Sequence, residues 1–299
     1  MDIDSHHHLW VPDPRRYPWL SAPSLAALNR PFGTADLAAA AAGTGIGATV
    51  VVQAAEDVTE TEELLAGPAA AGPGLVMAAV VGWLDLADPG APDRLARLLA
   101  GPGGRRLAGL RANLRDTGDP GRLAGPVPAA ALRRLAGEGL ALDVLAGPPG
   151  LAAVTALAAA HPDLRVILDH AGHPPLGAPA AELAAWAASV RRLARHPNVA
   201  VKFSGLLTRA AGVRWDAADL RPVAETLLAA FGEDRVMFGS DWPVCLLSAS
   251  YAEVAAAARE ALSGADPGRV FGGNARSWYR LRGQARAGET PGQQGQGQG

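Results

Sequence analysis

Short apolar runs recur along the chain and alternate with longer stretches rich in alanine, leucine, arginine and glutamate. The runs carry valine, isoleucine or leucine and are typical of buried β-strands. The stretches between them, such as 151–160 and 222–231, have the composition of helices. Strands are therefore predicted to begin near eight positions: Ile3, Thr49, Leu75, Leu107, Leu140, Arg165, Val199 and Arg235.

The spacing of these strands predicts a single-domain (β/α)₈ barrel of the TIM type. Their starts lie about 33 residues apart on average, enough for one strand, one helix and their loops. A doubly wound open sheet is the alternative, but it would carry a G-x-G-x-x-G turn after a strand, and none of these strands has one. We expect the barrel to occupy residues 1–282. Residues 283–299 have almost nothing apolar to bury and are expected to be a disordered tail.

Composition excludes several classes of protein. Of 299 residues, 49% are hydrophobic and 19% are charged, as in a globular chain. The net charge of -2 and the lack of basic runs argue against a nucleic-acid partner. No apolar run approaches the ~20 residues of a membrane span, and the start does not read as a signal peptide. The single cysteine, Cys245, forms no internal disulfide, so we expect a cytoplasmic location. The oligomeric state is not predicted.

Polar residues that end a barrel strand are candidate site residues, because the carboxyl ends of the strands meet at one mouth. The first strand ends in three histidines, of which His6 and His8 project to one side and the histidine between them to the other. His170 ends the sixth strand, with His173 further out on its loop. Asp241 ends the eighth strand.

Two strands also place a cation on the face that carries their small residues, and we expect this face to line the barrel. Arg111 and Asn113 share such a face on the fourth strand, and Lys202 lies on it in the seventh. Lys202 is the single lysine among 27 basic residues, which suggests a need for a compact ammonium group. The alternatives are a rim salt bridge for Arg111 and a lysine that reaches the rim for Lys202.

The long connection after the first strand contains Trp19 and a proline-rich stretch. Loops that follow barrel strands lie on the catalytic face, so this one is a candidate wall or lid. The alternative is a loop that is simply packed on the barrel through Trp19.

Histidines and a carboxylate that converge on a barrel mouth have two related uses. They bind a divalent ion, or they orient a water molecule against an electrophilic carbonyl. Both uses lead to hydrolysis. A His-x-His pair on the first of eight strands, with an aspartate at the end of the eighth, therefore predicts a hydrolase.

These residues resemble the amidohydrolase superfamily, whose hallmark is D-x-H-x-H on the first barrel strand and an aspartate at the end of the eighth. The similarity is closer to the lactonase branch (amidohydrolase-related, family 2), which includes L-fuconolactonases, L-rhamnonolactonases and 2-pyrone-4,6-dicarboxylate lactonases. Similar segments cover nearly the whole chain to about Leu281 and include IDSHHHLW, GLRANLRD, DLRVILDHAGHPP, NVAVKFSGLLT, RVMFGSDWPVC and FGGNARSWYRL.

The resemblance implies roles for the candidate residues. The catalytic core would consist of His6, His8, His170 and Asp241. Asp241 would activate the water that attacks a lactone carbonyl, while Arg111 and Lys202 would contact substrate or stabilise the oxyanion. Further substrate contacts are expected from Asn113, Glu56, His173, Trp10, Trp83 and Trp242.

The sequence departs from the superfamily pattern in two places. The fifth strand offers Asp143 but no histidine, and the fourth offers no bridging lysine or glutamate, so the binuclear metal site of many members cannot form. One divalent ion such as zinc still fits the four core residues, and metal-independent catalysis is the alternative. The other departure is His173, where relatives often have lysine.

The function that we expect is therefore the opening of a sugar-acid (aldono)lactone, or a similar small-molecule lactone, by water attack on its carbonyl. A metal-dependent non-oxidative decarboxylase of the same superfamily is the main alternative. A non-catalytic binding role is disfavoured, because four candidate groups stand at matched strand ends.

Overall fold

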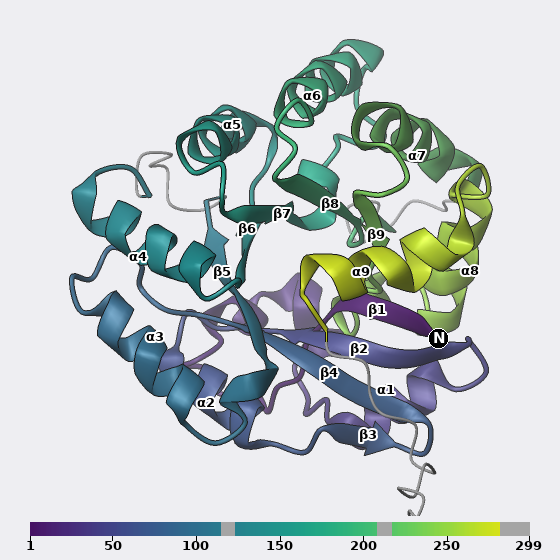
Figure 1. The fold of residues 1–299 in the computed structure, drawn as a ribbon. Coiled ribbons are helices and arrows are strands. Elements are labelled where there is room, and N and C mark those ends of the chain that lie inside the picture. The colour runs from purple at the N-terminus through teal and green to yellow at the C-terminus, as the bar shows by residue number, and fades with distance from the viewer. Residues whose placement is uncertain (115–122, 208–216, 282–299) are drawn as a thin grey trace, which may run out of the picture.

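The computed structural model describes residues 1–114, 123–207 and 217–281, so the predicted tail at 283–299 lies outside the described residues. Within these ranges eight strands, parallel to one another and in chain order, form a sheet and confirm the predicted strands (Figure 1). They are β1 (Asp2–His7), β2 (Ile46–Val52), β4 (Leu75–Gly82), β5 (Leu107–Asn113), β6 (Ala141–Leu145), β7 (Arg165–Leu168), β8 (Val199–Phe203) and β9 (Val236–Phe238).

The sheet curls until its last strand meets its first. The Asp241 N–H donates to the His6 carbonyl at 2.8 Å, and the His8 N–H donates to the Trp242 carbonyl at 2.7 Å. These bonds nearly close the barrel and confirm the predicted fold class. A further strand, β3 (Ala70–Gly72), pairs antiparallel with β4. It is not predicted by the sequence, because Ala-Ala-Gly carries no strand-forming side chain.

In the described residues an α-helix follows each barrel strand and covers the outside of the barrel (Figure 1). Some helix starts are determined locally: Asp57 accepts a hydrogen bond from the Thr59 N–H at 2.9 Å before α2, and Ser250 with Glu253 forms a capping box before α8. The helices are α1 (Thr34–Ala41), α2 (Val58–Ala66), α3 (Ala91–Ala100), α4 (Pro126–Gly137), α5 (Leu151–Ala160), α6 (Ala180–Leu193), α7 (Ala217–Phe231) and α8 (Tyr251–Ala261).

Short helical turns lie in the connections. The loop after β1 contains η1 (Pro18–Ser21) and η2 (Pro23–Leu28), and η5 (Asp169–Gly172) follows β7 directly. The other turns are η3 (Gly104–Arg106), η4 (Pro148–Gly150), η7 (Val244–Leu247) and η8 (Arg269–Gly273).

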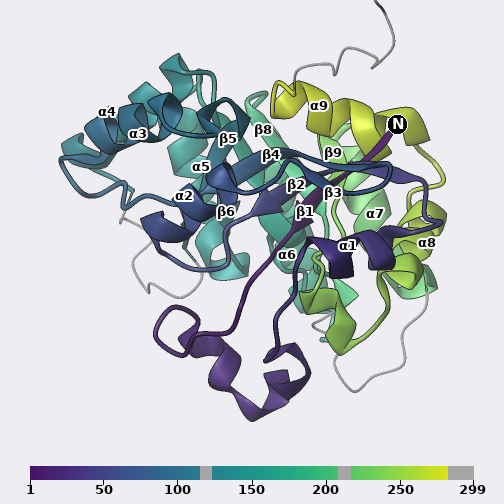
Figure 2. The same ribbon diagram turned by 90° about the horizontal axis from the view of Figure 1, so that it is seen from below.

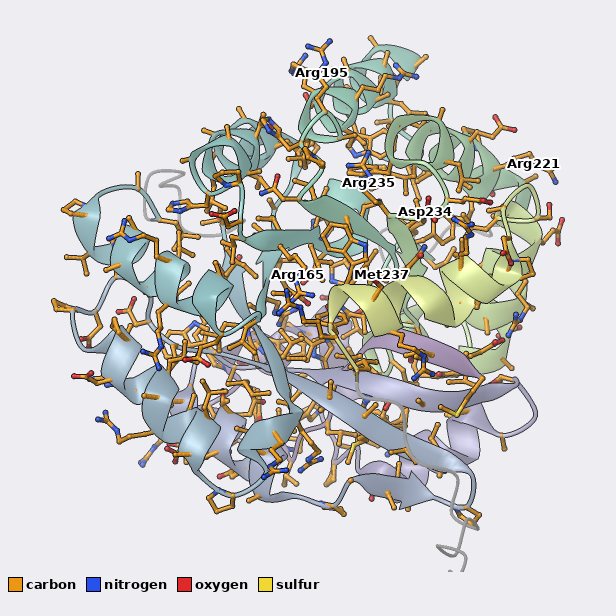
Figure 3. All side chains as sticks on the ribbon, in the orientation of Figure 1. Arg165, Arg195, Arg221, Asp234, Arg235 and Met237 are labelled. Carbon is orange, nitrogen blue, oxygen red and sulfur yellow. The ribbon has the colours of Figure 1, made fainter. Side chains whose placement is uncertain are left out.

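Two apolar layers stabilise the barrel. The inner layer consists mainly of small and β-branched strand residues such as Ala48, Val50 and Ala200, together with Met237 (Figure 3). The outer layer lies between strands and helices and is rich in leucine, for example Leu110 and Leu132. Because both faces of each strand are buried, the strands read as nearly continuous apolar runs in the sequence.

The two ends of the barrel are covered differently. The short helix α9 (Asn274–Trp278) and Tyr279 pack at the end where the chain begins, and the loop after β1 lies at the opposite end (Figure 2). Arginines such as Arg195 and Arg221 project outward into solvent (Figure 3). No helix in the described ranges is both long enough and apolar enough to cross a membrane.

Candidate active site

A cavity of about 530 Å³ lies at the carboxyl ends of the barrel strands. Its walls come from the ends of most barrel strands and from the loop after β1, so residues far apart in the sequence share it. Several residues singled out in the sequence line this cavity: His8, Glu56, Arg111, Asn113, His170, His173 and Asp241.

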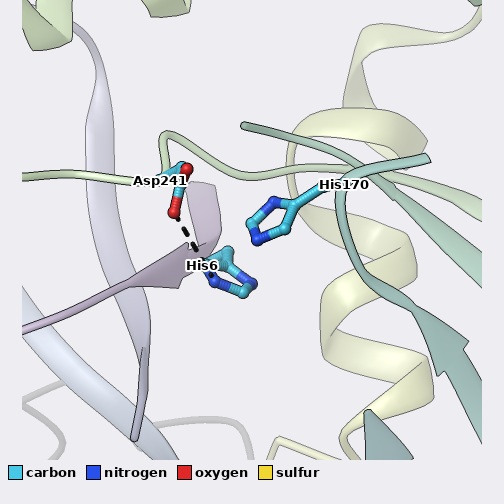
Figure 4. A group of neighbouring side chains, drawn as sticks. All are labelled: His6, His170 and Asp241. Carbon is cyan, nitrogen blue, oxygen red and sulfur yellow. Dashed lines mark ion pairs between the residues drawn. The ribbon is translucent and has the colours of Figure 1, made fainter. Parts of the chain in front are cut away.

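The structure brings the four proposed core residues together: His8, His170 and Asp241 line this cavity, and the fully buried His6 lies against them. Figure 4 shows three of the four, His6, His170 and Asp241. The Nε2 atom of His6 lies 3.2 Å from Nε2 of His8 and 3.8 Å from Oδ1 of Asp241. His8 Nε2 lies 3.5 Å from the same aspartate oxygen. One ring nitrogen of His170 completes a group in which the donor atoms of His6, His170 and Asp241 all lie within 4.8 Å of one another.

The backbone turns sharply where two of these side chains are attached. His170 and Asp241 have φ angles of 52° and 56°, in the left-handed region that residues other than glycine rarely adopt. Gly205 faces both of them. A Cβ atom at Gly205 would lie 2.4 Å from His170 Nδ1 and 2.9 Å from Asp241 Oδ2, so the close approach of β8 to the site requires glycine here.

Asp4 joins the strand ends that carry the core. Its carboxylate is fully buried and accepts hydrogen bonds from the backbone N–H groups of His6 at 3.0 Å and Ser240 at 2.8 Å. The hydroxyls of Ser240 and Tyr251 donate to its other oxygen at 2.6 and 2.9 Å. Asp4 therefore sets the relative position of the segments that end in His6 and Asp241, which explains the first aspartate of the motif in structural terms.

Burial favours the neutral form of the core histidines, and a neutral imidazole is suited to bind a metal ion and not to carry a proton. Burial lowers the pKa of His8 to about 3 and that of His170 to about 4. The pKa of His6 falls well below its ordinary value, because of burial and then of the charge on Lys202. Burial raises the pKa of Asp241, although His170 and Arg111 oppose that rise. Near neutral pH the imidazoles are thus neutral and the carboxylate is a stronger base than an exposed one.

Lys202 points into the barrel as its strand face predicts, but it does not lie where the expected contact with substrate would be made. Its side chain is fully buried inside the barrel, beneath His6, and does not line the cavity. The ammonium group lies 2.5 Å from Asp143 Oδ2 and 3.1 Å from Asp169 Oδ1. Tyr279 donates to Asp143 at 2.7 Å. Burial raises the pKa of Asp143 to about 6 against the opposing charge of Lys202.

Sequence reasoning missed the residues that surround Lys202. The pattern of strand ends identifies Asp143 only as the residue that stands in place of a histidine, and it does not point to Asp169 or Tyr279. The position of Asp169, directly after β7 and directly before His170, is the feature of the sequence that could have marked it as a site residue. Burial acts to raise the pKa of Asp169, but the charge of Lys202, together with the interaction with His6, outweighs it and holds that pKa well below its usual range.

Arg111 is the cation that reaches the cavity from the described part of the barrel. Its guanidinium donates to the Gln53 carbonyl at 2.6 Å and lies 3.8 Å from Asp169 Oδ2, while 8% of the residue is exposed. The ring of His173 is fixed by a contact between its Nδ1 atom and the Ala146 carbonyl oxygen at 3.1 Å. These contacts leave one face of each side chain toward the cavity.

The tryptophans are arranged differently from the sequence-based expectation. Trp10 and Trp242 are buried and do not line the cavity; each packs edge-on against Phe32. Trp83 lines a smaller neighbouring hollow of about 20 Å³ that also touches Glu56 and Asn113. Among the tryptophans of the described ranges, the one that lines the main cavity is Trp19.

The loop after β1 is anchored as a wall of the cavity. Trp19 stands edge-on against Trp10 at 5.3 Å, and the Tyr17 hydroxyl donates to the buried Glu60 carboxylate at 2.8 Å. Glu60 also accepts a hydrogen bond from the N–H of Ala54, a residue that lines the same cavity, at 2.9 Å. The loop therefore has both predicted properties: it packs on the barrel and it encloses the site.

The donor set of the core fits a divalent ion. The Nδ1 of His8 lies 2.8 Å from the Val52 carbonyl, which only accepts, so the lone pair of the neutral ring is on Nε2. Tetrahedral zinc with Zn–N bonds of about 2.0–2.1 Å separates its ligand atoms by roughly 3.3 Å, and the spacing of 3.2 Å between the Nε2 atoms of His6 and His8 is close to this. With Asp241 and His170, these residues form a His-rich set that zinc prefers.

Comparison with known proteins gives a consistent result. A protein-family model described as Amidohydrolase matches residues 3–281. The chain is 36% identical to L-fucono-1,5-lactonase of Burkholderia ambifaria over 286 residues, covering 93% of this chain and 95% of that protein. It is 38% identical to L-fucono-1,5-lactonase of Burkholderia multivorans over 293 residues, covering 93% and 96%. A crystal structure of an amidohydrolase from Burkholderia multivorans with bound zinc matches with a TM-score of 0.85 at 35% identity, covering 94% of this chain and all of that one.

Proposed function

The chain belongs to the amidohydrolase family, and from this premise we propose that it is a hydrolase that opens the lactone ring of a sugar acid. The observation that carries the proposal is the convergence of Asp241 with three neutral imidazoles, two of which line a cavity of about 530 Å³ together with Asp241. The likeness to L-fucono-1,5-lactonases over nearly the full length supports the same reaction.

Asp241 is the base in this proposal. Its carboxylate takes a proton from a water molecule, and the water oxygen bonds to the lactone carbonyl carbon. The carbonyl oxygen becomes negatively charged, and Arg111 is the cation in the cavity wall that can stabilise it. The bond between that carbon and the ring oxygen then breaks, and the proton passes from Asp241 to the ring oxygen. The product is the open hydroxy acid.

A divalent ion, when bound, would be held by His6, His8, His170 and Asp241 and would polarise the carbonyl or lower the pKa of water. Without an ion, the neutral imidazoles of His8 and His170 would hold the water beside Asp241 through their free lone pairs. In either case the Asp241 carboxylate exchanges the proton.

The lining of the cavity suits a substrate whose ring has one apolar face and several hydroxyl groups. Trp19, Leu25 and Val244 provide apolar surface, while Glu56 and Asn113 offer polar groups for hydroxyl groups of the sugar. The metal-dependent decarboxylase that the sequence also allows is less well supported, because the two relatives that are 36% and 38% identical over nearly the whole chain are lactonases. The cytoplasmic location stays a prediction that rests on composition.

A panel of aldono-1,5-lactones tests this function directly. Purified protein is added to each lactone in weak buffer with a pH indicator, with and without a chelator. We expect at least one lactone to release acid well above its spontaneous rate. Acid release after chelation would exclude obligatory metal chemistry. Release of carbon dioxide from an aromatic acid, with no lactone opened, would contradict the proposal.

Trp19 is expected to contribute to substrate binding and not to the chemical step. Trp19→Ala should raise KM about tenfold with little change in kcat, because ring stacking of roughly 1–1.5 kcal/mol corresponds to about that factor. Trp19→Phe should retain most of the affinity. Val11→Ala, on the same loop but 71% exposed, is the matched control. An unchanged KM in Trp19→Ala would remove Trp19 from the binding surface.

A further inference from the structure

Lys202 has three acceptors around its ammonium group and all three are buried. Asp143 Oδ2 lies 2.5 Å away, Asp169 Oδ1 lies 3.1 Å away and Nδ1 of His6 lies 3.1 Å away. The contacts to Asp143 and His6 have hydrogen-bond geometry, whereas the contact to Asp169 is an ion pair. None of these atoms is reached by solvent, since Lys202, Asp143 and Asp169 are all fully buried. The contact between Lys202 and His6 therefore lies wholly inside the barrel, out of reach of solvent.

Two groups compete for the same ring nitrogen of His6. Nδ1 has hydrogen-bond geometry to Lys202 at 3.1 Å, whereas Asp169 Oδ1 is only slightly farther away at 3.3 Å. Neither oxygen of Asp169 has a partner with hydrogen-bond geometry among the described residues. Lys202 occupies Nδ1 in this structure, and Asp169 is a buried acceptor positioned to accept from it.

The choice between these partners determines where the proton of the neutral ring lies. A lysine donates only, so in the Lys202-paired form Nδ1 holds the lone pair and the proton is on Nε2. That proton points at Nε2 of His8, 3.2 Å away, which carries a lone pair. In the Asp169-paired form Nδ1 carries the proton, and Nε2 of His6 turns its lone pair toward His8 and Asp241.

Only the Asp169-paired form offers His6 Nε2 as a ligand, because a metal ion needs a lone pair. We propose that Lys202 is a positioning residue that holds His6 in the tautomer protonated on Nε2 and thereby weakens binding of a divalent cation at the core, while Asp169 favours the binding tautomer. The inference rests on the cation site of the proposed function but not on lactone hydrolysis, and its test needs no substrate.

The first measurement is zinc affinity, by competition with a chromophoric chelator. Loss of Lys202 alone would also remove a positive charge, which by itself attracts a cation. The informative variant is therefore Lys202→Met combined with Asp143→Asn, which removes one charge of each sign. We expect it to bind zinc about 10- to 100-fold more tightly than the wild type, the range by which partners of metal-binding histidines change affinity.

Asp143→Asn alone is the matched control, since it leaves Lys202 on His6 and makes the site more positive. It should bind zinc no more tightly than the wild type. Equal zinc affinity in the double variant and the wild type would overturn the proposal, as would the same tightening in Asp143→Asn alone.

The second measurement reads the tautomer itself and needs no substitution at Lys202. Ring ¹⁵N shifts of the metal-free wild type, labelled on histidine and assigned with His6→Gln, should show His6 protonated on Nε2. The double variant should show the proton on Nδ1. A wild-type His6 protonated on Nδ1 would refute the proposal whether or not the variants fold.

Discussion

Replacement of Asp241 by asparagine is expected to lower kcat for lactone hydrolysis by about a hundredfold to ten-thousandfold, the range that a general base contributes. Asparagine has nearly the same size, but its amide does not take a proton from water. KM should change much less, because the substrate ring is held mainly by other walls of the cavity. The measurement is steady-state kinetics on the best lactone of the panel.

The fold should tolerate this substitution. Asp241 has a φ of 56°, and asparagine is among the residues that adopt this left-handed region most readily. Glu56→Gln is the matched control, because Glu56 is another carboxylate on the same cavity wall. It should keep kcat within a few-fold of the wild type. A near wild-type rate in Asp241→Asn, with an unchanged melting temperature, would exclude the proposed base.

The buried charges beneath the site should produce the largest effect on stability. Lys202→Met is expected to lower the free energy of unfolding by about 3–5 kcal/mol, because it leaves Asp143 and Asp169 without their cation in the barrel interior. Adding Asp143→Asn should recover part of this loss, since the second substitution removes one of the two unpaired carboxylates. Urea unfolding of the wild type, both single variants and the double variant gives the coupling energy.

A coupling between Lys202 and Asp143 of about 1–3 kcal/mol is expected for contacting groups in one network. Additive effects of the two substitutions would mean that the ion pair contributes nothing beyond its separate side chains. Arg94→Met is a suitable comparison, because Arg94 pairs with Asp88 at 3.0 Å but both side chains are about a third or more exposed. Its cost should be within about 1 kcal/mol.

The comparison between sequence and structure is clearest at the strands. Each barrel strand is buried on both faces, so its apolar run is visible without any knowledge of its neighbours, and the spacing of eight such runs is typical of a barrel. Strand alternation also predicted that His6 and His8 share a face and that Lys202 points inward. β3 escaped prediction because its pairing with β4 depends on a neighbouring edge and not on its own residues.

At the site, the sequence by itself determined which strand ends carry a histidine, an arginine or a carboxylate, because side-chain direction follows from local geometry. Only the tertiary structure decided how deep each side chain lies and what it meets. Trp10 and Trp242 follow strand ends yet are buried away from the cavity, whereas Trp19 reaches it from the middle of a loop. Lys202 points inward as expected, but its position beneath His6 depends on Asp143 and Asp169, which come from β6 and from η5 after β7. Those distances arise only when the sheet closes on itself, and a one-dimensional pattern does not contain them.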